Sequence, residues 1–139
     1  MHERGQMTVE FAVAFPVLLA VALIAVNALM FMSTCAAFDN TFRQLASTYC
    51  TSLGSGQTVQ DATANVLATL SDAFDEDNVS VSLETEHAVC GYTTYIATLD
   101  FYPTYFGMSF RSSFLGVSLA PLRHQESITL DGYKPGVFL

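Results

Sequence analysis

The chain has 139 residues and a formal net charge of −8, with five Lys and Arg residues against thirteen Asp and Glu residues. This acidic balance argues against binding to nucleic acid or to anionic lipid, because both partners require clusters of basic side chains. The length allows one small domain beside any membrane segment. Eleven of the acidic residues follow Met32, so the charge belongs to the C-terminal part of the chain.

The most informative segment is an apolar run that has no charged residue between Phe11 and Phe38. Its core, Phe11–Met32, contains twenty-two residues and is interrupted only by Pro16 and Asn27. A helix of that length spans roughly 33 Å, slightly more than the hydrocarbon thickness of a bilayer. Because the run is also longer than the ~7–15 apolar residues of a secretory signal, it predicts a membrane-spanning helix.

A carboxylate, Glu10, stands immediately before this run, and Gly5 lies a few residues upstream. Near a membrane interior a carboxylate is unfavourable by up to about 3 kcal/mol. In one interpretation Glu10 lies among the lipid headgroups and complements the positive end of the helix dipole. In the other, cleavage after Gly5 makes Gln6 the new N-terminus, and the freed amine of one subunit pairs with Glu10 of its neighbour.

Residues 4–19, with the sequence RGQMTVEFAVAFPVLL, resemble the beginning of TadE-like minor pilins (pseudopilins) of the tight-adherence, or Flp, pilus. Members of this family have a glycine, a few small or apolar residues, Val-Glu-Phe-Ala, and then a proline and a leucine-rich helix. Val9–Ala12 and Pro16–Leu19 match that order. The resemblance extends over about residues 4–32 and beyond them is only architectural.

The resemblance implies roles for several of these residues. A prepilin peptidase, which is a membrane aspartic protease, would cleave between Gly5 and Gln6. Glu10 would act in assembly together with Phe11 and Pro16 of the same motif. The implied partners are this peptidase, other pilin and pseudopilin subunits, the platform proteins of the assembly machinery and the lipid bilayer.

The same resemblance implies a division of the chain into three parts. Residues 1–5 would be the leader, residues 6–32 the transmembrane and assembly helix, and residues 33–139 an exported head. The protein would span the cytoplasmic membrane once, with the head outside the cytoplasm, and could then enter an extracellular pilus. Two rival processing sites remain, although neither explains the upstream glycine and carboxylate: Met32–Cys35 faintly resembles a lipoprotein box, and Thr34–Ala37 a signal-peptidase site.

Three cysteines, Cys35, Cys50 and Cys90, are typical of an exported domain with one disulfide and one remaining thiol. On one continuous helix Cys35 and Cys50 would lie about 22 Å apart, which is beyond disulfide reach. Cys50 and Cys90 are therefore the expected pair, and three free thiols are the alternative. A metal site is not indicated, because no CxxC motif or cluster of histidines accompanies the cysteines.

After the span the pattern predicts an α+β head. The first helix should continue to about residue 52, because apolar side chains recur at helical spacing until Leu53–Gln57, where paired glycines favour an end. Thr58 predicts the N-cap of a second amphipathic helix over about residues 58–75, with Asp61 as its capping-box partner. An antiparallel sheet of about three strands should follow, formed by Val79–Glu84, Thr93–Tyr102 and a third strand within Ser118–Leu130.

No motif for catalysis or metal binding stands out. GxSxG, Walker, HExxH and GxGxxG patterns are absent from the sequence. His124 and Glu126 would share one face of a strand but form no triad by themselves. The acidic run Asp75–Asn78 lacks the spaced ligands of an EF-hand loop and favours a solvated turn. We therefore expect no enzymatic activity, no cofactor and no metal site.

Two alternatives to an assembly protein stay open. One is a single-pass, membrane-anchored extracytoplasmic binding module without a pilus role, and the less favoured one is a secreted enzyme. A dense group of apolar side chains either caps the core of the head or forms an adhesive or subunit-docking surface. This group comprises Tyr102, Tyr105, Phe106, Met108, Phe110 and Phe114.

Overall fold

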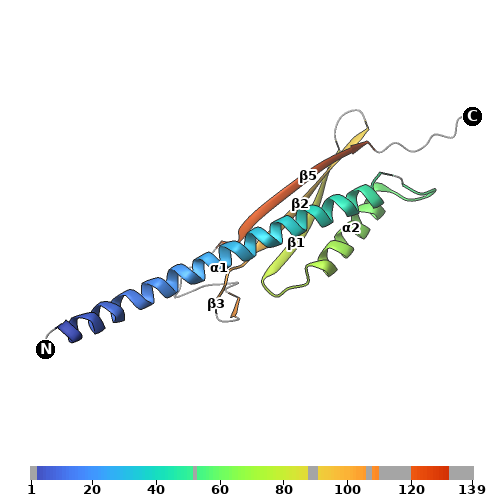
Figure 1. Cartoon of the computed structure of the whole chain (residues 1–139). Helices are drawn as coiled ribbons and strands as arrows, with labels where there is room; N and C mark the ends of the chain where they lie inside the picture. The colour runs from blue at the N-terminus through green and yellow to red at the C-terminus, as the bar shows by residue number, and fades with distance from the viewer. Residues whose placement is uncertain (1–2, 52, 88–90, 106–107, 110–119, 132–139) are drawn as a thin grey trace, which may run out of the picture.

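The computed structural model describes residues 3–51, 53–87, 91–105, 108–109 and 120–131. In these residues the chain forms two helices and five strands, most of which are labelled in Figure 1. They are α1 (Glu3–Tyr49), α2 (Val59–Ala73), β1 (Val79–His87), β2 (Tyr92–Phe101), β3 (Thr104–Tyr105), β4 (Met108–Ser109) and β5 (Leu122–Asp131). The α+β class that the sequence predicts is confirmed.

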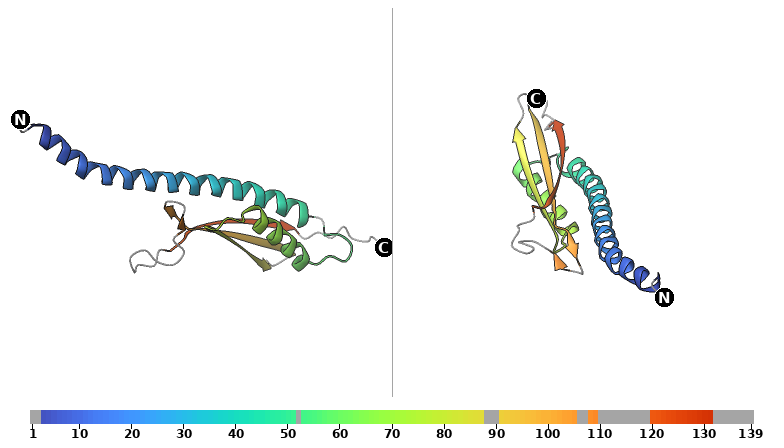
Figure 2. Two further views of the ribbon diagram at one scale, coloured as in Figure 1. Left: turned by 90° about the horizontal axis from the view of Figure 1, so that it is seen from below. Right: turned by 90° about the vertical axis from the view of Figure 1, so that its left-hand side faces the viewer.

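The 47-residue helix α1 has two halves with different surroundings. Its N-terminal half extends beyond the rest of the molecule, and its C-terminal half lies along the head (Figures 1 and 2). Pro16 lies inside the helix, and Figure 2 shows the axis curving in the N-terminal part. Proline has no N–H to donate and crowds the preceding turn, which bends helices at such positions. The long continuous helix is confirmed, and it ends at Tyr49, close to the predicted end.

The main sheet has three antiparallel strands in the order β1–β2–β5. The hairpin β1–β2 is in register with Val79 opposite Phe101, and β5 pairs with the other edge of β2. Strands β3 and β4 form a separate two-stranded pair. The hairpin and the third strand confirm the sequence prediction. Strand β1 continues past the predicted Glu84 because Thr85–His87 also find partners on β2.

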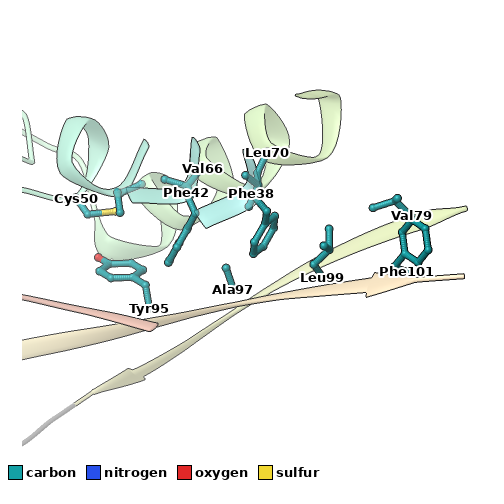
Figure 3. Packing of buried hydrophobic residues seen from close by; sticks show 12 residues of the cluster. Phe38, Phe42, Cys50, Val66, Leu70, Val79, Tyr95, Ala97, Leu99 and Phe101 are labelled. Atoms are coloured by element: carbon teal, nitrogen blue, oxygen red, sulfur yellow. The ribbon is translucent and has the colours of Figure 1, made fainter. Parts of the chain in front are cut away.

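Helices α1 and α2 pack together on this sheet and enclose the core, which Figure 3 shows from close by. Alternate residues of β2 from Tyr95 to Phe101 point into it, as the sequence pattern predicts. The face of α1 that contacts the head is narrower than the series of apolar side chains at helical spacing, because Ala36, Ala37 and Tyr49 of that series are exposed. The buried apolar residues are Phe38, Phe42, Ala46, Cys50, Ala62, Val66, Leu70, Val79, Tyr95, Ala97, Leu99 and Phe101.

Helix α2 begins with the capping box that the sequence predicts. The Thr58 N–H donates to the Asp61 carboxylate at 2.8 Å, and the Asp61 N–H donates to the Thr58 hydroxyl at 3.2 Å. The hydrogen bonds that the Thr58 backbone and hydroxyl donate hold the pKa of Asp61 below its usual value. The helix ends at Ala73, slightly before the predicted end, and Phe74 is its C-cap residue.

Candidate functional site

The N-terminal half of α1 presents an apolar surface that the head does not cover. By length and composition this helix can cross a membrane, and no residue of its most apolar window is buried. Contiguous apolar surface of this kind marks a site that lipid or another protein covers. Its exposed large side chains are Met7, Val9, Phe11, Val13, Phe15, Val17, Leu18, Leu19, Val21, Ile24 and Val26.

The predicted processing site lies at the exposed end of this helix. Both Gly5 and Gln6 are exposed, and a Cβ atom added at Gly5 would meet no atom within 4 Å. Packing within this chain therefore does not require a glycine there. Glycine inside a helix is also less stable than alanine by about 1 kcal/mol. A requirement from outside the chain, such as a narrow protease cleft, would account for this residue.

Glu10 follows Gln6 by one helical turn, and the Gln6 side-chain amide donates a long hydrogen bond of 3.5 Å to its carboxylate. The two predicted residues are thus brought together on one face of α1. Among the described side chains Glu10 forms no ion pair. It borders a shallow apolar depression on the helix surface that is lined by Val9, Glu10, Val13, Ala14, Val17 and Leu18.

Phe11 and Pro16 lie on the same uncovered surface. Phe11 is 67% exposed, and its ring centroid lies 5.8 Å from that of Phe15. Pro16 lies one turn beyond, inside the helix. Both residues of the predicted assembly motif therefore shape the outside of α1 and take no part in the core of the head.

Asn27 is the point at which the apolar helix meets the head, and in the sequence it is visible only as an interruption of the apolar run. Its side chain is 5% exposed. The amide nitrogen donates to the Leu23 and Thr104 carbonyls at 2.9 Å each, and the amide oxygen accepts from the Thr104 N–H at 2.8 Å. One turn further, the Phe31 ring lies 5.6 Å from that of Phe101. Contacts with the head therefore reach into the predicted span of residues 6–32.

Two polar side-chain contacts join the C-terminal half of α1 to β5. The Nε2 atom of His124 lies 2.7 Å from the Asp39 carboxylate, and the Nε atom of Arg43 donates to Glu126 at 2.9 Å. His124 and Glu126 both contact α1, which confirms the prediction that they share one face of the strand. Partly exposed pairs of this kind contribute about 0–1 kcal/mol each. They orient the sheet on the helix more than they stabilise it.

Cys50 is buried at the C-terminal end of α1, and Figure 3 shows its sulfur near the Tyr95 hydroxyl. Burial raises the pKa of the Cys50 thiol, and burial together with the nearby thiol raises the pKa of Tyr95. Burial and then the Asp39 charge raise the pKa of the partly buried Cys35. Cys35 and Cys50 are free thiols in this structure, and Cys90 lies outside the described residues. The Cys50–Cys90 disulfide stays a prediction.

The remaining predicted features are only partly within the described residues. Tyr102 and Tyr105 are half-buried, whereas Phe106, Phe110 and Phe114 lie outside the described residues. In the described ranges no group of three or more His, Cys, Asp or Glu side chains could hold a metal ion.

No family model, curated protein or solved structure matches this chain. The geometry itself combines a long apolar N-terminal helix with a small α/β head that packs on the second half of that helix. The architecture is pilin-like.

Proposed function

We propose that this protein is a TadE-like minor pilin, or pseudopilin, which takes part in the assembly or structure of a tight-adherence pilus. The observation that carries the proposal is the position of Glu10, on an uncovered apolar helix and one turn after Gln6. A helix that only anchors a head in lipid gains little from a carboxylate there. In a helix that packs against copies or relatives of itself, the carboxylate can pair with a positive charge on the neighbouring helix.

Cleavage after Gly5 would place a positively charged amine on Gln6, about 6 Å along the axis from Glu10. When two such helices pack side by side, the amine of one subunit and the carboxylate of the next can pair. Pairing offsets part of the free energy that desolvation of both charges requires. Because any other axial offset leaves both charges unpaired in apolar surroundings, the pair selects one register between subunits.

Before assembly the uncovered half of α1 would hold the protein in the cytoplasmic membrane, with the head outside the cytoplasm. The prepilin peptidase, other pilin and pseudopilin subunits and the assembly platform are the proposed partners. We assign the protein a structural role and no catalytic one. The alternative is an anchored binding module that uses the same helix only as a membrane span.

The N-terminal mass of the protein purified from its native host tests the proposal. We expect loss of the first five residues, so that Gln6 is the N-terminus, and we expect no such loss in a host that lacks the prepilin peptidase. Gly5→Leu should remain inserted but uncleaved, because the larger side chain blocks the protease cleft. Ala25→Leu, a matched enlargement on the exposed surface of the same helix, should be cleaved normally.

Two results would overturn this function. An intact N-terminus on the wild-type protein would favour the anchored binding module. An N-terminus at Ala36 or Ala37 would indicate an ordinary secretory signal and exclude a membrane-held pilin.

A further inference from the structure

Asn27 is the first buried residue along the described side chains of α1, and its distance from Gln6 matches the thickness of a membrane. Residues 6–26 are exposed apart from the half-buried Leu23. These twenty-one residues make about 31 Å of helix, close to the ~30 Å of hydrocarbon in a bilayer. If Gln6 lies at the cytoplasmic boundary of the hydrocarbon, Asn27 lies at the outer boundary.

The β3 end of the head lies at the same level as Asn27. Two hydrogen bonds join the Asn27 amide to the backbone of Thr104, the first residue of β3. Figures 1 and 2 show β3 beside the middle of α1, at the end of the head that is nearer to the uncovered half of the helix. Because the Asn27 amide already has partners for its donors and its acceptor, it can lie next to hydrocarbon without an unsatisfied polar group.

We propose that the β3 end of the head is a membrane-interface surface, which rests in the headgroup layer on the outer side of the membrane, and that Asn27 sets its depth. Tyr102 and Tyr105, both half-buried, flank the Asn27–Thr104 contact in sequence. Tyrosine rings favour the headgroup level of a membrane because they are apolar with one polar end. The inference rests on the proposed insertion of α1 and adds the position of the head.

The acidic run Asp75–Asp77 indicates which headgroups this surface fits. All three side chains are exposed, and the carbonyl of the next residue, Asn78, accepts from the Tyr102 N–H at 2.7 Å. Three carboxylates therefore lie close to the proposed interface. Anionic headgroups would repel them and salt would screen the repulsion. The partner of this surface is accordingly a zwitterionic phospholipid layer.

Tryptophan fluorescence can measure these depths, because the chain contains no tryptophan of its own. Full-length Phe15→Trp, Tyr105→Trp and Tyr49→Trp are reconstituted separately in phosphatidylcholine vesicles whose acyl chains carry bromine at known depths. We expect deep bromines to quench Phe15→Trp and bromines near the headgroups to quench Tyr105→Trp. Tyr49→Trp, about 33 Å beyond Asn27 along the helix, should be quenched by neither.

The outcomes separate this inference from the function on which it rests. Quenching of Phe15→Trp without quenching of Tyr105→Trp would overturn the interface and leave the membrane helix intact. Absence of quenching at Phe15→Trp would overturn insertion itself. When phosphatidylglycerol replaces part of the phosphatidylcholine at low salt, quenching of Tyr105→Trp should decrease and added salt should restore it. An increase would contradict the preference for zwitterionic lipid.

Asn27→Leu tests whether this residue sets the depth. Added to Tyr105→Trp it should abolish interfacial quenching, and added to Phe15→Trp it should leave quenching unchanged. Unchanged quenching of Tyr105→Trp would show that other contacts position the head. The variants that keep Asn27 test the interface independently, even where the leucine variant loses the fold of the head.

Discussion

Replacement of Asn27 by leucine should weaken the docking of the head on α1 while leaving a helix that is better suited to lipid. The substitution removes two hydrogen bonds with the Thr104 backbone, and each such bond contributes about 0.5–1.5 kcal/mol net. The N–H and C=O of Thr104 would then lie beside an apolar side chain, where an unsatisfied group costs about 1–3 kcal/mol. Because Thr104 is only half-buried, water can form hydrogen bonds with these two groups and offset part of this cost.

We therefore expect the free energy of unfolding of the head to fall by about 2–4 kcal/mol, a large share of the ~5–15 kcal/mol of a typical domain. Urea unfolding of the full chain in detergent micelles, followed by the near-ultraviolet circular dichroism of the tyrosines, measures this change. Thr34→Val is the matched control, because the Thr34 hydroxyl donates to the Met30 carbonyl of the same helix. If Asn27→Leu lowers the free energy of unfolding no more than Thr34→Val does, the Asn27–Thr104 hydrogen bonds do not stabilise docking. Docking of the head would then depend on the apolar core alone.

Three further experiments test the assembly residue, the disulfide and the helix cap. Glu10→Ala should insert and be cleaved normally yet fail to enter or support pili, because the neighbouring amine loses its counter-charge; wild-type amounts in sheared pili would contradict this. Non-reducing peptide mapping of the native protein should recover Cys50 linked to Cys90, a bond worth about 4 kcal/mol in the chain-entropy model. A crosslink that contains Cys35, or alkylation of all three thiols without reductant, would exclude that bond. Thr58→Ala should lower the free energy of unfolding by about 1 kcal/mol in urea titrations, whereas Ser55→Ala in the same exposed loop should not.

The two helices and the three long strands could be predicted from the sequence because their signals are local, whereas the short pair β3–β4 was not predicted. The spacing of Ala62, Val66 and Leu70 and the cap at Thr58 lie within one helix, and both are found in the structure. The alternation from Tyr95 to Phe101 similarly determined which face of β2 is buried. Such patterns need no knowledge of the partner element.

The contacts that place the head on α1 could not be predicted in this way. Asn27 and Thr104 are 77 positions apart, and the amide in an apolar run gave no indication of its partner. The sequence pattern places His124 on a strand face, but the identity of its partner, Asp39, depends on how β5 lies across α1. These contacts follow from tertiary register, which local sequence patterns do not reveal. A polar residue inside an apolar run was nevertheless a usable signal, because it requires partners when water is excluded.

In the proposed assembly, Glu10 and Asn27 would together give the head a defined place. Glu10 lies about 26 Å along the axis from Asn27. Pairing at Glu10 would select the axial position of one helix against the next, and the Asn27–Thr104 contact joins the head to that helix. An error of one helical turn at Glu10 would therefore displace the head by about 5.4 Å. Since separation of the head from α1 would expose the Asn27 amide next to hydrocarbon, helix and head should leave the membrane as one body. The register selected at the N-terminus would thus become the register of the heads.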